Sequence, residues 1–500
     1  MHTYLGRKGY TLKKEGLTTT ELFELRNDLC VKPNNQMNGY VSNISYPIYR
    51  ESDHKIYIPR YYGQDKYGIP HKNLIKSGED IEIEFKGTLF DYQNNIIRKY
   101  VDHVKHSGGG LLDVEPGKGK TVMALNIITK LKKKTLVVVH KTFLMNQWKE
   151  RINQFIPNAR VGIIQGQCID IEDKDIVIGM LQTLSTKRFP VEIVNQFGLT
   201  VYDECHHLSA EVFSNVMLNF VTNYTLGLSG TMTRKDGLTK VFKYFIGPVV
   251  HKEKTDNKIQ VCIKAVVFED PENDEYNNVE VDYKGNPMYS KMITKLCSNE
   301  MRTQMIVNLI SYELKRNYDQ QIMILAHNKK LINDLYSNIQ TFEPSVGLYV
   351  GGMKEAELKV SEDKKVIVAT YAMASEGLDI KTLTTLLMAT PKSDVCQSVG
   401  RILRSKHDNP LVIDIIDSHD IFKRKFQKRC QYYKKKEYKV QRITNLNHYM
   451  SNIYSEKDYS LKKSNTKQIE TDSDDSDGND IEKKSKCKEP PKCLIDLSAL

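Results

Sequence analysis

The chain has 500 residues, long enough for about three domains, and its composition of 40% hydrophobic and 27% charged residues is typical of a globular protein. The N-terminal stretch "MHTYLGRKGYTLKKEG" lacks the apolar region of a signal peptide, and no apolar run approaches the roughly 18 residues of a membrane span. We therefore expect an intracellular protein that is not embedded in a membrane. Lys and Arg number 73 against 62 Asp and Glu, and this net charge of +11 favours a polyanionic partner.

The nine cysteines are scattered along the chain and never form a C-x-x-C pair. This spacing argues against a zinc site or a disulfide framework and fits a reducing compartment. The cysteines stand at positions 30, 168, 205, 262, 297, 396, 430, 487 and 493.

Residues 1–85 contain short alternating stretches such as "HKIYIPRYYG" and "DIEIEF", which predict small strands joined by turns and hence an N-terminal accessory module. From 86 to 250, apolar runs alternate with helical segments, the pattern of a parallel sheet with crossover helices. The runs are "TLVVVH", "DIVIGM", "LTVYDE" and "TLGLSG". We expect this region to form one α/β lobe.

A second series of apolar runs predicts a second parallel-sheet lobe over 298–443, of which 421–443 is a basic extension. Its runs are "QIMILAH", "KVIVAT", "TTLLMAT" and "PLVIDII". Residues 251–297 include the acidic stretch "EDPENDEYNN" and are predicted to be a linker or insertion. Residues 444–500 are predicted to be a low-complexity, disordered tail, to which we assign no function.

The stretch "VEPGKGKT" at 114–121 follows a predicted strand end and precedes a helical pattern from Val122 to Leu131. Backbone N–H groups in such a turn point at an anion. Lys120 would reach the β and γ phosphates of a nucleotide, and the Thr121 hydroxyl would bind Mg²⁺. A strict P-loop has glycine where this chain has Val114; a plain glycine turn with a solvated lysine is the alternative. The other predicted nucleotide-binding positions of the turn are Glu115, Pro116, Gly117, Lys118 and Gly119.

The stretch "LTVYDECHH" at 199–207 is an apolar strand that ends in two carboxylates. Asp203 would hold the Mg²⁺, and Glu204 would orient and deprotonate the attacking water. Together with an upstream phosphate loop, the pair predicts an NTP hydrolase. It disfavours a kinase, because the acceptor of a kinase should not share its site with an activated water.

"DECHH" resembles the DExH box of superfamily 2 helicases, and other blocks follow in the order of that family over about 85–420. The blocks are "LFDYQ", "VEPGKGKT", "VVVHKTFLMNQW", "MLQTLS", "LSGTMTRKDG", "MILAHN", "ATYAMASEGLDI" and "QSVGRILR". "RKDG" and "FLMNQWKERI" are more similar to XPB-like helicases and to the transcript-release helicases of large DNA viruses than to DEAD-box RNA helicases. Cys205 stands where Ala is usual, and Gly230 where many relatives have Ala.

The resemblance implies an α/β fold with two tandem RecA-like parallel-sheet lobes, a small strand-rich N-terminal module and a disordered C-terminal tail. It implies ATP and Mg²⁺ as cofactors and lobe closure on ATP as the motion that moves a nucleic-acid strand. The residue roles that it implies are adenine reading by Gln93, coupling by His206, Ser229 and Thr231, an inter-lobe position for Gly377 and Asp379, and completion of the site by Gln397, Arg401 and Arg404.

Some features have simpler interpretations. His206 and His207 lack the further ligands of a metal site, and Trp148, the only tryptophan, is expected in the core rather than as a base-stacking platform. The basic stretch 421–443 could be a solvated helix, yet its cations and Tyr432 and Tyr433 favour sequence-independent nucleic-acid contact. Its cations are Lys423, Arg424, Lys425, Lys428, Arg429, Lys434, Lys435, Lys436 and Lys439.

The sequence therefore predicts an ATP-dependent helicase or translocase. It leaves open whether the polymer is DNA or RNA. It also leaves open a nucleic-acid-stimulated ATPase that remodels complexes, as in transcript release, without unwinding. The transcription machinery is a candidate partner. A composition rich in Lys, Asn and Ile suggests an AT-rich genome and, together with the resemblance, a large DNA virus as the source. A viral source would place the protein at a cytoplasmic replication site or in the virion.

Overall fold

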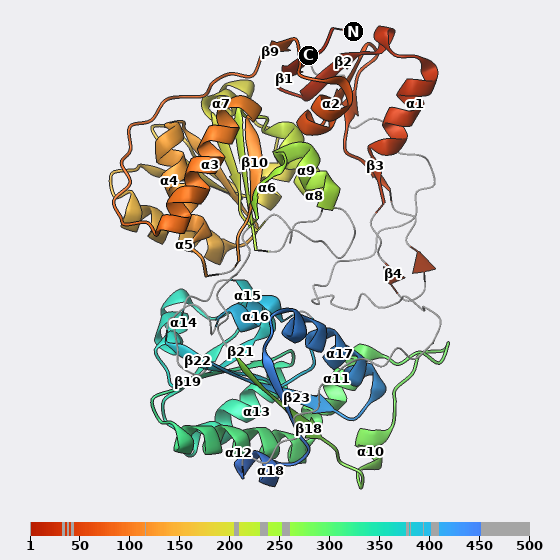
Figure 1. The fold of residues 1–500 in the computed structure, drawn as a ribbon, viewed down its shortest axis with the longest axis vertical. Helices are drawn as coiled ribbons and strands as arrows, with labels where there is room; N and C mark the ends of the chain where they lie inside the picture. Colours follow the sequence, from red (N-terminus) through yellow and green to blue (C-terminus); the bar gives the residue numbers. More distant parts are fainter. Residues whose placement is uncertain are drawn as a thin grey trace. The chain divides into compact units, whose positions relative to one another are not determined.

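The protein forms two compact units, one from the N-terminus to Lys254 and one that begins at Thr255 (Figure 1). The structure is a computed structural model. It describes residues 2–32, 36–37, 40–41, 45–115, 117–204, 210–230, 239–252, 261–376, 380, 382–393, 395–401 and 410–451. None of the helices within these ranges is both long and apolar enough to cross a membrane.

A five-stranded sheet, ordered β7-β8-β2-β1-β9, opens the first unit. Its alternating pattern buries Tyr10, Leu12, Ile56 and Ile58 on one face. Helix α1 begins with a capping box, in which Thr18 and Glu21 each accept a hydrogen bond from the other's backbone N–H. The elements of this module are β1 (Tyr4–Gly6), β2 (Gly9–Lys13), a 3-10 turn (Lys14–Gly16), α1 (Thr19–Asp28), β3 (Cys30–Val31), β4 (Gln36–Met37), β5 (Tyr40–Val41), β6 (Tyr46–Pro47), β7 (Arg50–Glu51), β8 (Lys55–Ile58), α2 (Arg60–Tyr67) and β9 (Lys72–Asn73).

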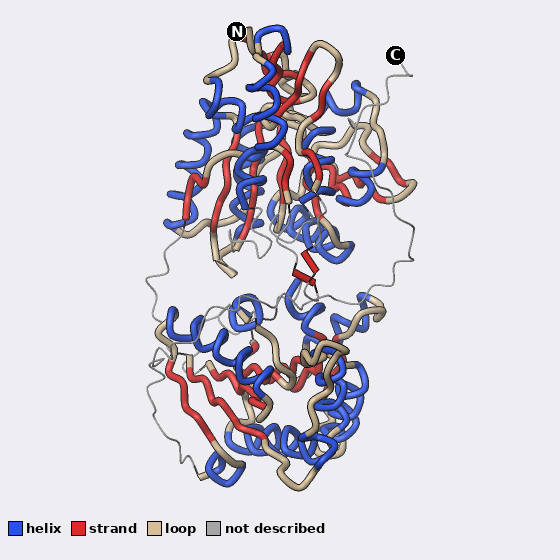
Figure 2. The backbone as a smooth tube through the Cα atoms, turned by 90° about the vertical axis from the view of Figure 1, so that its right-hand side faces the viewer, coloured by secondary structure: helices blue, strands red, loops and turns tan. Residues whose placement is uncertain are grey.

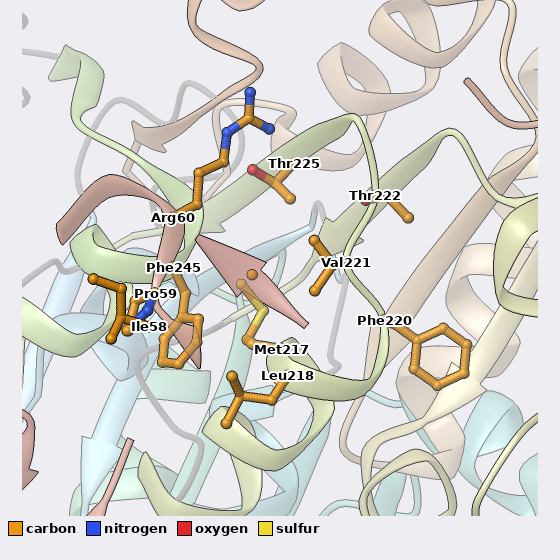
Figure 3. Close-up of a pocket in the computed structure, with 11 residues that line it drawn as sticks. Ile58, Pro59, Arg60, Met217, Leu218, Phe220, Val221, Thr222, Thr225 and Phe245 are labelled. Atoms are coloured by element: carbon orange, nitrogen blue, oxygen red, sulfur yellow. The ribbon is translucent and has the colours of Figure 1, made fainter. Parts of the chain in front are cut away.

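This N-terminal module packs directly against the larger sheet domain of its unit. Arg50 donates a 2.7 Å hydrogen bond to the Asn219 side chain, and Arg60 donates one of 2.9 Å to the carbonyl of Asn223. Figure 3 shows the small cavity between them, with the Arg60 side chain extending away from Met217 and Phe245. Its volume of about 20 Å³ suits a single water molecule, so it is a packing seam and not a ligand site.

The larger domain of the first unit is an eight-stranded sheet, ordered β13-β12-β14-β11-β15-β16-β10-β17, and only β13 is antiparallel to its neighbour. Alternate residues of β11 enter two cores: Leu136 and Val138 face one, and Val137 and Val139 face the other. Helices therefore cover both faces (Figure 2). The elements are α3 (Asp91–Ser107), β10 (Gly109–Asp113), α4 (Lys120–Leu131), β11 (Thr135–Val139), α5 (Thr142–Phe155), β12 (Val161–Gln165), β13 (Cys168–Asp170), β14 (Ile176–Met180), α6 (Leu181–Thr186), α7 (Val191–Gln196), β15 (Leu199–Tyr202), α8 (Ala210–Asn219), β16 (Tyr224–Ser229), α9 (Thr239–Ile246) and β17 (Val249–Lys252).

The second unit is a seven-stranded parallel sheet, ordered β20-β21-β19-β22-β23-β18-β24. Strand β19 again divides its side chains between two cores, with Ile322 and Ile324 in one and Met323 and Leu325 in the other. The elements are β18 (Cys262–Phe268), α10 (Asp274–Asn277), α11 (Tyr289–Ser298), α12 (Glu300–Arg316), β19 (Gln321–Ala326), α13 (Lys329–Gln340), β20 (Val346–Tyr349), α14 (Glu355–Glu362), β21 (Val366–Thr370), α15 (Tyr371–Glu376), β22 (Leu383–Met388), α16 (Cys396–Arg401), β23 (Leu411–Asp417), α17 (Asp420–Lys435), β24 (Lys439–Ile443) and α18 (Leu446–Met450).

The prediction of two parallel-sheet lobes is confirmed, but the second sheet begins before residue 298. Strand β18 lies between β23 and β24, inside the region 251–297 that was predicted to be a linker or insertion. It does so because its apolar residues pair in register with β23, about 150 positions later in the chain. Helix α18 likewise extends the packed region past 443, since Tyr449 is fully buried. The rest of the predicted tail, 452–500, lies outside the described residues.

Candidate active site

The turn between β10 and α4 has the shape of a phosphate loop because two glycines take left-handed backbone angles. Gly117 has φ +84° and Gly119 has φ +79°, a region that costs other residues energy. A Cβ on Gly119 would also lie 2.5 Å from the side-chain nitrogen of Gln93. Helix α4 starts directly after, at Lys120, and the N–H groups of a first helical turn have no acceptor within the helix. The turn can therefore present backbone donors to an anion.

Asp203 and Glu204 follow the buried strand β15 and lie beside this turn. The ammonium of Lys120 is 2.6 Å from Oε1 of Glu204. Asp203 is buried, with only 6% of its surface exposed, and its Oδ2 accepts a 2.8 Å hydrogen bond from the indole N–H of Trp148. Burial, and after it the neighbouring Glu204 carboxylate, raise the pKa of Asp203 to about 6, although Lys120 and Trp148 oppose the shift. The pair predicted from sequence is thus joined to the predicted lysine.

Glu204 holds a backbone conformation that few residues other than glycine adopt, with φ +46°. Such angles persist only where the surrounding structure fixes them, and they are frequent at active sites. In this case, the fixed points are the Asp203 side chain, which accepts from the Glu204 N–H at 3.0 Å, and the Lys120 contact. The strained angle directs the Glu204 side chain toward the phosphate loop.

Trp148 has a role that the sequence did not reveal. It is buried in the core, as expected, but its N–H is used to orient Asp203. The two residues are 55 positions apart, on α5 and after β15. A signal was present nonetheless, because a buried tryptophan needs an acceptor for its N–H.

Gln93, in the first turn of α3, links that helix to the phosphate loop. Its amide oxygen accepts from the Phe90 N–H at 3.1 Å, and its amide nitrogen donates to the Lys118 carbonyl at 3.1 Å. Tyr92 donates to the same carbonyl, also at 3.1 Å, a contact that sequence reasoning missed. The Phe90 ring stacks on Tyr92 and remains 68% exposed. The Gln93 side chain therefore holds the backbone of the loop at Lys118. The predicted contact of Gln93 with adenine stays a prediction.

The chain is similar to known proteins over most of its length. Residues 86–234 match the family described as "Type III restriction enzyme, res subunit". The chain is also 36% identical over 454 residues to "Putative ATP-dependent RNA helicase L396" of Acanthamoeba polyphaga mimivirus, a match that covers 88% of this chain and 86% of that protein. The chain belongs to the superfamily 2 helicases of large DNA viruses.

The helicase is similar to further proteins at lower identity. It is 27% identical over 404 residues to "Putative ATP-dependent RNA helicase QP509L" of African swine fever virus (isolate Pig/Kenya/KEN-50/1950), over 72% of this chain and 75% of that one. "The crystal structure of T4 UvsW" aligns with 86% of this chain and 96% of that chain, at 19% identity and a TM-score of 0.34, a likeness too low to bear on function. The prediction of an ATP-dependent enzyme that acts on nucleic acid is confirmed.

Ser229 connects the phosphate loop of the helicase to the end of β16. It is fully buried and stands opposite Asp113 in the parallel pairing of β10 with β16. Its carbonyl accepts from the Val114 N–H at 3.0 Å, so the first residue of the loop is fixed to this strand end. The other two predicted coupling residues, His206 and Thr231, lie outside the described residues, as does Pro116 in the loop.

The second unit of the helicase carries the remaining predicted residues on and near α16. Gln397 and Arg401 belong to this helix, although their side chains lie outside the described part. Gly377, Asp379 and Arg404 are outside it altogether. The structure thus brings Gln93, Lys120, Asp203, Glu204 and Ser229 together in the first unit and leaves the second-unit residues to the proposal below.

Proposed function

We propose that the helicase hydrolyses ATP at the β10–α4 turn. Lys120 would bind the β and γ phosphates. Glu204 would take a proton from the water that attacks the γ phosphorus, while ADP leaves with its phosphate oxygen. The contact of 2.6 Å between Lys120 and Glu204 is the main support, because it brings the phosphate-binding group and the base to the same point.

The same contact gives the site a resting arrangement. While the Lys120 ammonium donates a hydrogen bond to Glu204, the Glu204 carboxylate is less able to accept a proton from a water molecule. A triphosphate carries more negative charge than one carboxylate and offers Lys120 better partners. ATP would therefore draw Lys120 away and release Glu204 as the base only when substrate is present.

We propose that Mg²⁺ is held by Thr121 and Asp203 together with phosphate oxygens. Carboxylate and hydroxyl oxygens are hard ligands of the kind that Mg²⁺ prefers, and it normally keeps water and phosphate for the rest of its shell. This fits the described residues, in which no group of three His, Cys, Asp or Glu side chains could hold a metal ion. Bound Mg²⁺ would neutralise charge on the β and γ phosphates.

Arg401 and Arg404, with Gln397, Gly377 and Asp379, would complete the site from the second unit. An arginine supplied from a separate lobe neutralises transition-state charge only when the lobes are closed. Hydrolysis would then be linked to movement on the nucleic acid. The resemblance of "QSVGRILR" to a block of the helicase family supports this proposal, and Arg401 is the last residue of α16.

We propose that nucleic acid contacts helix α17 through its backbone phosphates, without reading sequence. The helix exposes a row of cations and buries its apolar side, so only some of the predicted contact residues remain candidates. Arg429 and Tyr433 are buried and pair with Asp414. The exposed cations are Lys423, Arg424, Lys428, Lys434 and Lys435.

Two relatives are named RNA helicases, which makes RNA the first polymer to test. We also propose a role beside the viral transcription machinery, at a cytoplasmic replication site or in the virion; the relatives support only the viral setting of this proposal. ATPase assays with single-stranded and duplex DNA and RNA should be run beside strand-displacement assays on the same polymers. Lys120→Ala serves as the inactive control, with rate lost by about 10³-fold or more and the fold retained. Wild-type hydrolysis by Lys120→Ala would refute the proposed site, and stimulation of ATPase without displacement would indicate remodelling without unwinding.

A further inference from the structure

The turn that follows β22 is held in an unusual way. Four consecutive backbone carbonyls, those of Ala389, Thr390, Pro391 and Lys392, each accept a hydrogen bond from a side chain of a different helix. The donors are Arg302 of α12 to Ala389 at 2.7 Å, Tyr371 of α15 to Thr390 at 2.7 Å, Tyr289 of α11 to Pro391 at 2.6 Å and Arg429 of α17 to Lys392 at 2.8 Å. We call these four bonds the carbonyl clamp.

Each arginine of the clamp also pairs with a carboxylate of β23. Arg302 makes two bonds to Asp417, at 2.7 and 2.9 Å, and Arg429 makes two to Asp414, at 2.8 and 2.9 Å. All four charged side chains are at most 1% exposed. Buried ion pairs of this kind contribute little net stability, because desolvation offsets their attraction. The two ion pairs instead fix the orientation of each guanidinium group, so that it donates to a carbonyl of the turn.

The turn is also tied to the neighbouring strand β19. The N–H of Ala389 donates to the Leu325 carbonyl at 2.8 Å. The Thr390 hydroxyl accepts from the His327 N–H at 3.1 Å and lies 2.8 Å from the His327 ring nitrogen. Ala389 and Thr390 are at most 1% exposed. A turn at the end of a strand could satisfy its carbonyls with water. Here, protein groups satisfy them, so the path of the chain is set by five surrounding elements.

The clamped turn ends three residues before α16, which begins at Cys396 and ends at Arg401. We propose that the carbonyl clamp sets the position of α16, and that Tyr289, Tyr371, Arg302 and Arg429 are positioning residues for ATP hydrolysis. The inference rests on the proposed function, in which Arg401 completes the site. An arginine that stabilises a transition state must be placed accurately, since an error of about 1 Å can reduce a rate about 100-fold.

The test removes the two tyrosine hydroxyls and keeps the rings. Tyr289→Phe, Tyr371→Phe and the double variant are made in the full chain. The double variant should lower kcat of nucleic-acid-stimulated ATP hydrolysis by about tenfold. The KM for ATP and the affinity for nucleic acid should stay within about twofold, because neither the phosphate loop nor α17 is altered. Each single variant should show a smaller loss of kcat in the same direction.

Tyr312→Phe is the matched control. Tyr312 also donates to a backbone carbonyl of the second unit, that of Met450, at 2.9 Å, but it lies outside the clamp. It should keep the wild-type kcat. A wild-type kcat in the double clamp variant would overturn the inference, and so would an equal loss of kcat in Tyr312→Phe.

Arg401→Ala and Arg404→Ala are measured in the same series to separate this inference from the function on which it rests. If both keep the wild-type kcat, the proposed arginine role is wrong, and the clamp inference falls with it. If they lower kcat and the double clamp variant does not, only the clamp inference is wrong. Loss of kcat in both sets supports it.

Discussion

In the first unit, the turn between β10 and α4 leaves backbone N–H groups for a ligand, whereas in the second unit the turn after β22 has its carbonyls covered by side chains. Both turns follow a strand that has a parallel neighbour on each side, and both precede a helix that carries predicted site residues. The first takes its shape from Gly117 and Gly119, and the second from four side-chain donors. In the proposed mechanism, one topology would serve two tasks, binding a substrate and placing a group that acts on it.

Among the variants that test this comparison, we expect Glu204→Gln to have the largest effect on ATP hydrolysis. The variant loses the base and should lower kcat by roughly 10²- to 10⁴-fold. It should also retain ATP, since Gln pairs less strongly than Glu with Lys120 and leaves the lysine to the phosphates. Filter binding of labelled ATP in a single-turnover experiment measures both. Glu211→Gln, an exposed glutamate on α8, is the control. Fast turnover without retained ATP would mean that the water is activated by another group.

Gly119→Ala tests whether the first turn depends on backbone freedom. Alanine is strained at φ +79°, and its Cβ would approach the Gln93 amide, so the loop must move. We expect the KM for ATP to rise about tenfold or more, with a loss of about 1–3 kcal/mol in unfolding free energy. Gly285→Ala is a matched control, because Gly285 has φ +82° with nothing near its Cβ direction. It should lose similar stability and keep its KM; a normal KM in Gly119→Ala would show that the loop tolerates a side chain.

Trp148→Phe tests whether the first unit, too, uses a side-chain donor for positioning. The change keeps most of the buried ring volume and removes the N–H that orients Asp203. We expect the Mg²⁺ concentration for half-maximal ATPase to rise about tenfold, with kcat restored at saturating Mg²⁺. A loss that is equal at all Mg²⁺ concentrations would instead indicate damaged packing.

The smallest effect concerns helix α17 and the residue after it, in the second unit. Replacement of Lys434, Lys435 and Lys436 by Ala should flatten the dependence of nucleic-acid affinity on salt, by roughly 0.7 to 0.9 in the log–log slope for each lost phosphate contact. The unstimulated ATPase rate should not change, because these lysines are remote in sequence from the phosphate loop. An unchanged slope would make α17 a solvated helix and move the nucleic-acid contact elsewhere.

The first turn could be predicted from sequence because its signals are local. A strand, two glycines and a helix stand within about 25 residues, and the carboxylates end an apolar run. The carbonyl clamp could not be predicted, since its donors come from four helices spread over more than 100 positions. Strand β18 was missed for a related reason: the acidic residues after it suggested a linker, while its partner β23 is distant in sequence.

The basic stretch shows what composition cannot resolve. A count of cations treats Lys428 and Arg429 alike, whereas the helix turns Arg429 inward and Lys428 outward. The spacing of Phe422, Phe426, Arg429 and Tyr433 is that of a single helix face, and it would have assigned Arg429 and Tyr433 to the core.

Trp148 has one more consequence, for how the enzyme can be observed. It is the only tryptophan in 500 residues, and its indole is hydrogen-bonded to the carboxylate proposed to bind Mg²⁺. Excitation at the red edge of protein absorption would therefore give light from a single position next to the proposed γ phosphate site. Any change in the charge on Asp203 alters the electric field across that indole, and its emission should shift accordingly. The unlabelled protein thus contains its own optical probe, with which metal arrival and release could be followed in stopped flow during each turnover.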